Sequence, residues 1–314
     1  MNLSPIAARQ DVALAFSHLA SLTGAADPAD YVRSMREIVR NYGDVEPRQP
    51  LAAVTCTPAA DAPVGAEWVC APNADPKRRI VYLHGGGWMA GDLYSHRPIA
   101  AALSKVAGAA VLLVDYRLAP EFPFPAGLQD CIAATTFAQA HGPDGPGEAA
   151  RLALVGDSAG GNFAAASCFR LTQSGGPTPD RLVLICAALD TTGQRPKTPS
   201  PSSEEDATSL AHLMSMYAPD GPPLTDPYIS PGLASDELLR RLPPTMLQVS
   251  SAEFLFADSQ RFADRLAANG VRSILSTWPG MPHVWHAFLS TLPEASMALA
   301  EIGAFVASSD TRGR

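Results

Sequence analysis

The sequence predicts an α/β fold, in which helices cover both faces of a mostly parallel sheet. Short apolar runs alternate along the chain with helical patterns of ten or more residues, and this alternation is typical of a parallel sheet. One such junction carries Gly156-Asp157-Ser158-Ala159-Gly160, which matches the pattern G-x-S-x-G. This pattern is typical of a tight strand-to-helix turn that exposes a serine, although glycine-rich turns also serve as plain connections or phosphate loops.

Length and composition exclude several classes of protein. The 314 residues suit one large α/β domain with an insertion, or two small domains, and 46% of them are hydrophobic. A formal net charge of -8 argues against a nucleic-acid partner, which would require a basic surface. The longest basic run, Lys77-Arg78-Arg79, is interpreted as a solvated strand entry.

Cysteine usage and hydropathy bear on the compartment. The five cysteines are scattered and form no C-x-x-C pair, so we expect neither a disulfide framework nor a zinc site. Unpaired cysteines are typical of a reducing compartment, and we therefore expect a cytoplasmic location. Residues 1–16 contain Arg9 and Asp11 and lack a long apolar core, so no signal peptide is expected there. No uncharged apolar stretch reaches the ~18 residues of a membrane span.

The first part of the chain is predicted to be helical. Apolar residues recur at helical spacing in residues 1–50, and Asp27-Pro28 is typical of a cap followed by proline in the first turn. These amphipathic helices form either a lid or simple packing outside the sheet.

Strands and helices then alternate up to the serine turn. We expect an edge strand at 64–70, and the strand at 79–83 ends in His84-Gly85-Gly86-Gly87-Trp88. The proline-rich residues 116–125 are predicted to be a fixed loop, and residues 141–147 a surface loop. The other expected elements in this part are a helix at 95–107, a strand at 110–115, a helix at 126–141 and the strand at 152–155.

The alternation continues after the serine, with one interruption. The polar residues 190–202 and a helix at 203–217 are interpreted as an insertion. The other expected elements are a helix at 162–171, strands at 181–187, 244–249 and 272–277, and helices at 258–268 and 293–306.

Ser158 requires a base and an acid to become a nucleophile. When the nucleophile lies on a tight strand-to-helix turn of a parallel α/β sheet, the acid and then the histidine follow it in the chain. Three histidines lie after Ser158, and His212 falls within the inserted helix. His283 is predicted to be the base, because Pro282 fixes its loop after the last strand, whereas His286 is interpreted as a structural histidine.

Two carboxylates are candidates for the acid that orients His283. Glu253 directly follows the strand at 244–249, whereas Asp258 lies where a helix is expected to begin and is interpreted as its N-cap. Position favours Glu253, and Asp258 remains the alternative.

The glycine loop after the strand at 79–83 suits an oxyanion site. Glycines let the backbone approach a substrate and direct its N–H groups, and the N–H of Ala159 would add a donor. A phosphate loop is disfavoured because neither G-K-[ST] nor G-x-G-x-x-G accompanies these glycines. His84 is interpreted as a brace for the loop, since no other cluster has metal-ligand spacing, and no metal is expected.

Together these residues resemble a known family. His84-Gly85-Gly86-Gly87-Trp88 followed by Gly156-Asp157-Ser158-Ala159-Gly160 is similar to the hormone-sensitive-lipase-like (family IV) bacterial carboxylesterases, and the resemblance runs from about residue 50 to 310. Asp115-Tyr116-Arg117-Leu118-Ala119-Pro120-Glu121 and Asp226-Pro227-Tyr228-Ile229-Ser230-Pro231 also resemble that family's loops.

The resemblance implies an α/β-hydrolase fold with an eight-stranded, mostly parallel sheet and a helical cap. The cap would comprise residues 1–50 and 191–225, and the catalytic domain residues 51–190 and 226–314. It further implies Ser158 as nucleophile and His283 as base. The implied oxyanion donors are Gly86, Gly87 and Ala159.

One position departs from the family pattern. The family's acid is usually aspartate followed by Pro-Leu, whereas this chain has Glu253-Phe254-Leu255. Because glutamate is one methylene longer, its loop is expected to lie slightly further back.

The implied activity is hydrolysis of short-to-medium acyl esters through an acyl-enzyme, without metal or organic cofactor. A deacetylase, lactonase or amidase specific for one metabolite would use the same machinery. A non-catalytic ligand receptor is a further alternative, which the presence of all three triad residues disfavours. The resemblance also implies a homodimer through the edge strand at 272–277.

Three aromatic residues are candidates for the substrate pocket, namely Trp88, Tyr31 and Tyr217. Packing within the core is an equally reasonable role for them, because most aromatic side chains fill cores.

Overall fold

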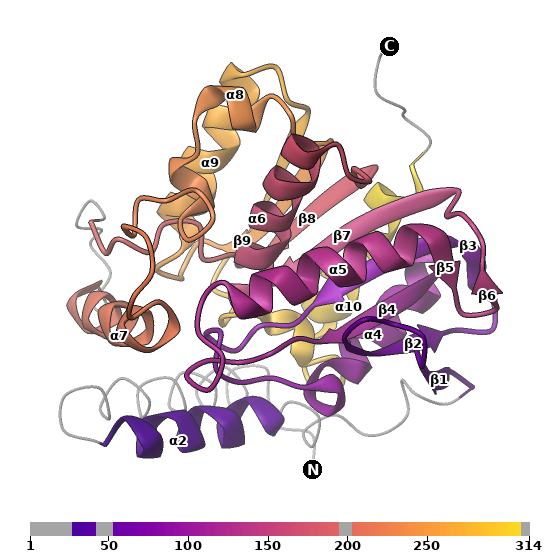
Figure 1. Cartoon of the computed structure of the whole chain (residues 1–314), viewed down its shortest axis with the longest axis horizontal. Coiled ribbons are helices and arrows are strands. Elements are labelled where there is room, and N and C mark those ends of the chain that lie inside the picture. The colour runs from indigo at the N-terminus through magenta and orange to yellow at the C-terminus, as the bar shows by residue number, and fades with distance from the viewer. Residues whose placement is uncertain (1–26, 42–52, 195–202, 309–314) are drawn as a thin grey trace.

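The computed structural model describes residues 27–41, 53–194 and 203–308 (Figure 1). Its centre is an eight-stranded sheet in the order β1-β2-β4-β3-β7-β8-β9-β10. Only β2 runs against the other strands, and the remaining pairs from β4 to β10 are parallel. The strands are β1 (Thr55–Pro58), β2 (Gly65–Cys70), β3 (Asp75–Leu83), β4 (Ala109–Asp115), β7 (Arg151–Asp157), β8 (Arg181–Ile185), β9 (Thr245–Ser250) and β10 (Ser273–Trp278).

Three details differ from the sequence-based expectation. The strand expected at the edge of the sheet is β2, but β1 pairs with it and takes the edge position. The four residues of β1 are all exposed and carry no apolar pattern. Strand β3 begins at Asp75 rather than Arg79, because its charged first half pairs with β4 through an irregular register. The expected loop at 141–147 contains a small hairpin of β5 (His141–Gly142) and β6 (Gly145–Pro146).

Helices occupy the connections where they were expected, and one further short helix, at Asp236–Leu239, was not expected. Asp27 caps the first described helix by accepting a hydrogen bond from Ala29 N, as predicted. The helix that precedes β4 begins after its N-cap residue Asp92 and ends at Gly108, which adopts a left-handed conformation. The helices are α2 (Pro28–Arg40), α4 (Leu93–Ala107), α5 (Ala126–Ala140), α6 (Ala159–Ser174), α7 (Ser203–Tyr217), α8 (Asp236–Leu239), α9 (Phe256–Ala268) and α10 (Pro293–Ala307), with single 3-10 turns η2 (Pro231–Leu233) and η3 (Trp285–Ala287).

Two apolar layers enclose the sheet. Alternate residues of β3 face opposite layers, with Val81 and Leu83 on one side and Ile80 and Tyr82 on the other. Helices α5, α6 and α9 cover the first side, and α4 and α10 cover the second. Figure 1 shows α5 and α6 in front of the sheet and α10 behind it. Strands buried on both faces explain why their sequences are continuous apolar runs.

The parallel strands direct their following loops to one edge of the sheet, where α2 and α7 also lie. The ring of Tyr31 in α2 packs edge-on against His212 in α7 at 4.9 Å. A Cβ placed on Gly87 would lie 3.1 Å from Met35 Sδ and 3.3 Å from Leu213 Cδ2. Both helices therefore meet beside the glycine loop that follows β3.

Parts of the predicted cap lie outside the described residues, namely 1–26, 42–50 and 195–202, so the two domain boundaries stay predictions. In the described part of the chain, no helix combines the length and apolar character that crossing a membrane requires.

Candidate active site

Ser158 occupies a strained turn between β7 and α6. Its φ of 52° and ψ of -118° lie in a region that residues with a side chain rarely adopt. The turn is held because Ser158 N donates to Ile185 O at 2.8 Å and Ser158 O accepts from Asn162 N at 3.1 Å. A Cβ on Gly160 would approach Leu83 O to 2.0 Å, and one on Gly156 would approach Gly160 O to 2.2 Å. The small residues of G-x-S-x-G are therefore required by close backbone contact.

His283 connects the serine to a carboxylate. Its Nε2 lies 3.0 Å from Ser158 Oγ, and its Nδ1 lies 2.6 Å from Glu253 Oε2. The histidine belongs to the loop after β10, where Val284 adopts a φ of 50° and turns the chain into η3. The side chains of His283 and Glu253 are 16% and 5% exposed, so the pair is shielded while the imidazole still reaches the surface.

The two candidate acids occupy different surroundings. Glu253 Oε1 accepts a hydrogen bond from Ser250 N at 2.9 Å, which leaves Oε2 for His283. Asp258 lies in the first turn of α9 rather than at its N-cap, and its carboxylate is 2.5 Å from the guanidinium of Arg261. The geometry therefore supports Glu253 over Asp258 as the partner of the imidazole.

The glycine loop has backbone conformations that other residues avoid. Gly86 has a φ of 123°, and Gly87 has a φ of 59°. A Cβ on Gly86 would lie 2.2 Å from Ala90 O, while Gly86 O accepts hydrogen bonds from Met89 N and Ala90 N. Ala159 is the first residue of α6, so its N–H has no partner within the helix and carries the positive end of the helix dipole.

His84 is placed as a brace beneath this loop. It is fully buried, stacks on Tyr116 at 4.2 Å and has its Nδ1 2.9 Å from Gly85 O. Burial and the nearby His96 lower the pKa of His84 to about 4, so the ring is neutral near pH 7.

His286 lies away from the serine, in a buried structural contact. Its Nε2 is 2.8 Å from Gln248 Oε1, and burial lowers its pKa to about 3. This placement agrees with its interpretation as a structural histidine.

The acidic residue of G-x-S-x-G has partners that the sequence did not reveal. Asp157 is buried, its Oδ1 accepts from Tyr82 OH at 2.8 Å, and its Oδ2 lies 3.5 Å from His96 Nε2. Burial by itself would raise the pKa of Asp157, but His96 and the Tyr82 hydrogen bond hold it below its usual value. The sequence offered one signal, since Tyr82 precedes the glycine loop on the strand beside β7.

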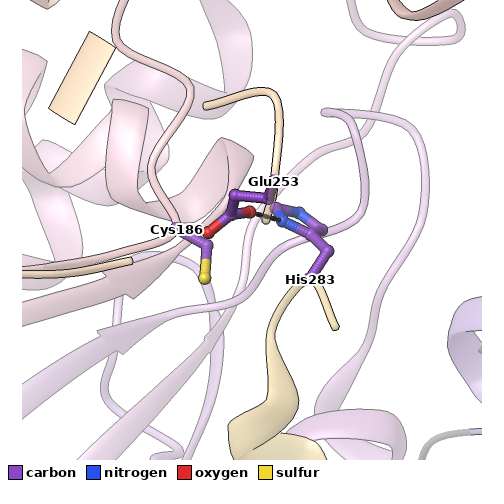
Figure 2. Close-up of side chains that lie close together, drawn as sticks. All are labelled: Cys186, Glu253 and His283. Carbon is purple, nitrogen blue, oxygen red and sulfur yellow. Dashed lines mark hydrogen bonds and ion pairs between the residues drawn. The ribbon is translucent and has the colours of Figure 1, made fainter. Parts of the chain in front are cut away.

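Cys186 is a second residue near the serine that the sequence did not reveal. It directly follows β8 with a φ of 45°, is fully buried, and lies beside Glu253 and His283 (Figure 2). Its thiol hydrogen-bonds to Glu253, and Val284 N–H hydrogen-bonds to its sulfur. Burial, followed by the charge of Glu253, raises the pKa of the thiol well above its usual value. The available signal was its position at the strand end, on the edge where the serine lies.

The three candidate pocket aromatics are all buried. Trp88 stacks on Tyr217 with ring centroids 4.8 Å apart, and Tyr31 packs against His212. Their contacts join the glycine loop to α7 and α2, and their role as a substrate lining stays a prediction.

Known proteins share this architecture. A family model described as alpha/beta hydrolase fold matches residues 80–287. The acetyl-hydrolase of Streptomyces hygroscopicus is 33% identical over 307 residues, which is 92% of this chain and 99% of that protein. Carboxylesterase NlhH of Mycobacterium tuberculosis (strain ATCC 25618 / H37Rv) is 35% identical over 229 residues, 70% of each chain.

A solved structure extends the likeness to the whole described fold. An esterase from the bacterial hormone-sensitive lipase (HSL) family superposes with a TM-score of 0.78 at 32% identity, covering 98% of this chain and 99% of that one. The chain therefore belongs to the α/β-hydrolase-fold family, in its hormone-sensitive-lipase-like branch.

Proposed function

We propose that this chain is a serine carboxylic ester hydrolase in which Ser158, His283 and Glu253 form the catalytic triad. The observation that carries the proposal is the hydrogen-bonded row from Ser158 Oγ to His283 Nε2, at 3.0 Å, and from His283 Nδ1 to Glu253 Oε2, at 2.6 Å. A strained, half-buried serine, an oriented imidazole and a carboxylate are the groups that acyl transfer requires.

The reaction proceeds through an acyl-enzyme. His283 Nε2 takes the proton of Ser158 as Oγ attacks the ester carbonyl, and Glu253 stabilises the imidazolium. The N–H groups of Gly86, Gly87 and Ala159 stabilise the negative oxygen of the tetrahedral intermediate. The imidazolium then gives its proton to the departing alcohol, and a water molecule activated by His283 releases the acid and frees Ser158.

The acyl group is proposed to be short to medium in length. The support is the family resemblance together with the relative named acetyl-hydrolase, which this chain matches over nearly its whole length. That name also supports the alternative of a deacetylase specific for one metabolite. A series of p-nitrophenyl esters from acetate to palmitate distinguishes them, because a general esterase hydrolyses several short esters whereas a specialist is inactive on all of them.

Covalent labelling tests the proposed nucleophile. The wild-type protein is expected to gain one phosphoryl group from a serine-directed organophosphate, at Ser158 by peptide mass spectrometry, with parallel loss of esterase activity. Ser158→Ala should neither react nor hydrolyse. Absence of labelling in folded wild-type protein would favour a non-catalytic ligand receptor and overturn the proposal.

The cap, pocket, location and assembly complete the proposal. Residues 1–50 and 191–225 are proposed to form a cap over a catalytic domain of 51–190 and 226–314, with Trp88, Tyr31 and Tyr217 lining the pocket beneath it. The contacts of α2 and α7 beside Gly87 support this arrangement. The free cysteines fit a cytoplasmic location, and the outer strand β10 fits a homodimer.

A further inference from the structure

A thiol that the proposed mechanism does not use lies beside the acid and base that it does use. We propose that Cys186, Glu253 and His283 form a binding site for a thiophilic divalent cation, with zinc as the probe, and that the bound cation switches the hydrolase off. Cation binding depends only on these three side chains, whereas the loss of activity rests on the proposed function.

The three side chains present ligand atoms at one point from separate loops. The sulfur of Cys186, a carboxylate oxygen of Glu253 and a ring nitrogen of His283 all lie within 4.8 Å of one another. They follow β8, β9 and β10, so neighbouring parallel strands deliver them to the same edge (Figure 2). Zinc bonds of about 2.0–2.3 Å require ligand atoms roughly 3–4 Å apart. Binding therefore needs a local opening of the 2.6 Å contact between His283 and Glu253, and the closing of any pair of ligand atoms whose separation is near the 4.8 Å limit.

The charges of this ligand set suit zinc. A thiolate and a carboxylate neutralise a divalent cation, which avoids a net charge in a site whose members are buried or nearly so. Thiolate and imidazole ligands favour zinc or cadmium over magnesium or calcium, which prefer oxygen. On binding, the sulfur–zinc bond forms and the Cys186 proton leaves to solvent, with no change of oxidation state. The Val284 N–H that hydrogen-bonds to the sulfur can support the thiolate as a second-layer donor.

Coordination at Nδ1 would disable His283 through its tautomer. Catalysis needs the ring proton on Nδ1, toward Glu253, and a lone pair on Nε2, toward Ser158. A cation on Nδ1 moves the single ring proton to Nε2, 3.0 Å from Ser158 Oγ. The imidazole then cannot accept the serine proton, so the rate of the chemical step falls while substrate binding persists.

Zinc titration of the full chain tests the consequence. Zinc chloride is expected to lower kcat for a short p-nitrophenyl ester at micromolar concentration, with recovery on adding EDTA, while magnesium chloride has no effect. Cys186→Ser, normalised to its own metal-free rate, should raise the zinc inhibition constant at least about tenfold. Cys56→Ser, which changes an exposed thiol, should leave that constant as in wild type. Equal inhibition of wild type and Cys186→Ser would overturn the proposal.

Cobalt spectroscopy tests binding without any ester. Wild-type protein titrated with cobalt(II) is expected to develop the near-ultraviolet thiolate-to-metal absorption band, which Cys186→Ser should lack and Cys56→Ser should retain. An esterase-inactive protein with the band would refute the proposed function and keep the site. Wild-type protein without the band overturns the site, and this measurement decides even if the Cys186 variant does not fold.

Discussion

Glu253 Oε2 lies 2.6 Å from His283 Nδ1, at the position where the family resemblance implies an aspartate. The other oxygen of its carboxylate, Oε1, accepts a hydrogen bond from Ser250 N at the end of β9. Both carboxylate oxygens of Glu253 therefore make hydrogen bonds, and Oε2 points at the imidazole.

Glu253→Gln tests this relationship with little change of volume. The amide can stabilise neither the required ring tautomer nor the imidazolium, so we expect kcat to fall by about 10³–10⁴ with KM little changed. Asp258→Asn is the matched control, since Asp258 is engaged by Arg261, and it should keep kcat within about tenfold. Steady-state kinetics on a short ester separate the two variants, and the opposite ranking would make Asp258 the acid.

Gly86→Ala tests the glycine loop. The added methyl group meets Ala90 O at 2.2 Å and the backbone must leave a φ of 123°, so the loop shifts and kcat should fall at least about 100-fold. Gly145→Ala is the control, because Gly145 also has a positive φ, 109°, but a Cβ there meets nothing within 4 Å. Similar losses of kcat in both folded variants would contradict a role for Gly86 near the reacting oxygen.

The Asp157 network predicts a difference between two tyrosines. Tyr82→Phe removes a hydrogen bond to a buried carboxylate, so we expect it to lower the free energy of unfolding by about 1.5–3 kcal/mol. Tyr116→Phe removes a bond to the neutral carbonyl of His84, for which about 0.5–1.5 kcal/mol is expected. Urea denaturation at pH 7.5 measures both, and a smaller effect for Tyr82→Phe would show that Asp157 does not depend on it.

Local pattern was enough to predict the parallel sheet and the position of Ser158 between a strand and a helix. Strands buried on both faces are continuous apolar runs, and strand β7 followed by glycines around Ser158 has few other structural interpretations. The order of Glu253 and His283 after the serine then follows from the topology, because successive parallel strands end at one edge.

What the sequence concealed depends on contacts between distant segments. Strand β1 is exposed throughout and gains its structure only by pairing with β2. Cys186 has no recognisable motif, and its neighbourhood with Glu253 appears only when β8 and β9 lie side by side. The partnership of His96 with Asp157 likewise joins a helix residue to a strand end.

Two buried histidines make stability depend on pH. The pKa of His84 is about 4 and that of His286 about 3 in the folded state, against 6.5 for the exposed side chain. Below pH 6.5 the unfolded chain therefore binds protons that the folded chain does not. Their stabilising contribution is complete above pH 6.5 and is lost as the pH falls toward 4, by up to ~1.4 kcal/mol per pH unit for each histidine.

His286→Gln should reduce that slope, since glutamine does not titrate. Urea denaturation between pH 4.5 and 8 measures the free energy of unfolding for both proteins. A wild-type stability that is constant from pH 7 to 5 would contradict neutral burial of these histidines. The pKa of Asp157 is lowered in the folded state, so this group reduces the free energy of unfolding only below about its ordinary pKa of 3.8, which is outside this pH range.

The outer strand β10 provides the last prediction, which concerns assembly. It pairs with β9 on one side and forms one end of the sheet, and Ile274 on it is 44% exposed. The terminal strand of the described sheet, with an exposed apolar side chain, favours pairing with another strand, and two copies related by a two-fold axis would join through β10. Light scattering after gel filtration is expected to give a dimer for wild type and a monomer for Ile274→Lys. Met297→Lys, at a 59% exposed position on α10, should remain dimeric. A monomeric wild-type protein at micromolar concentration would refute this assembly.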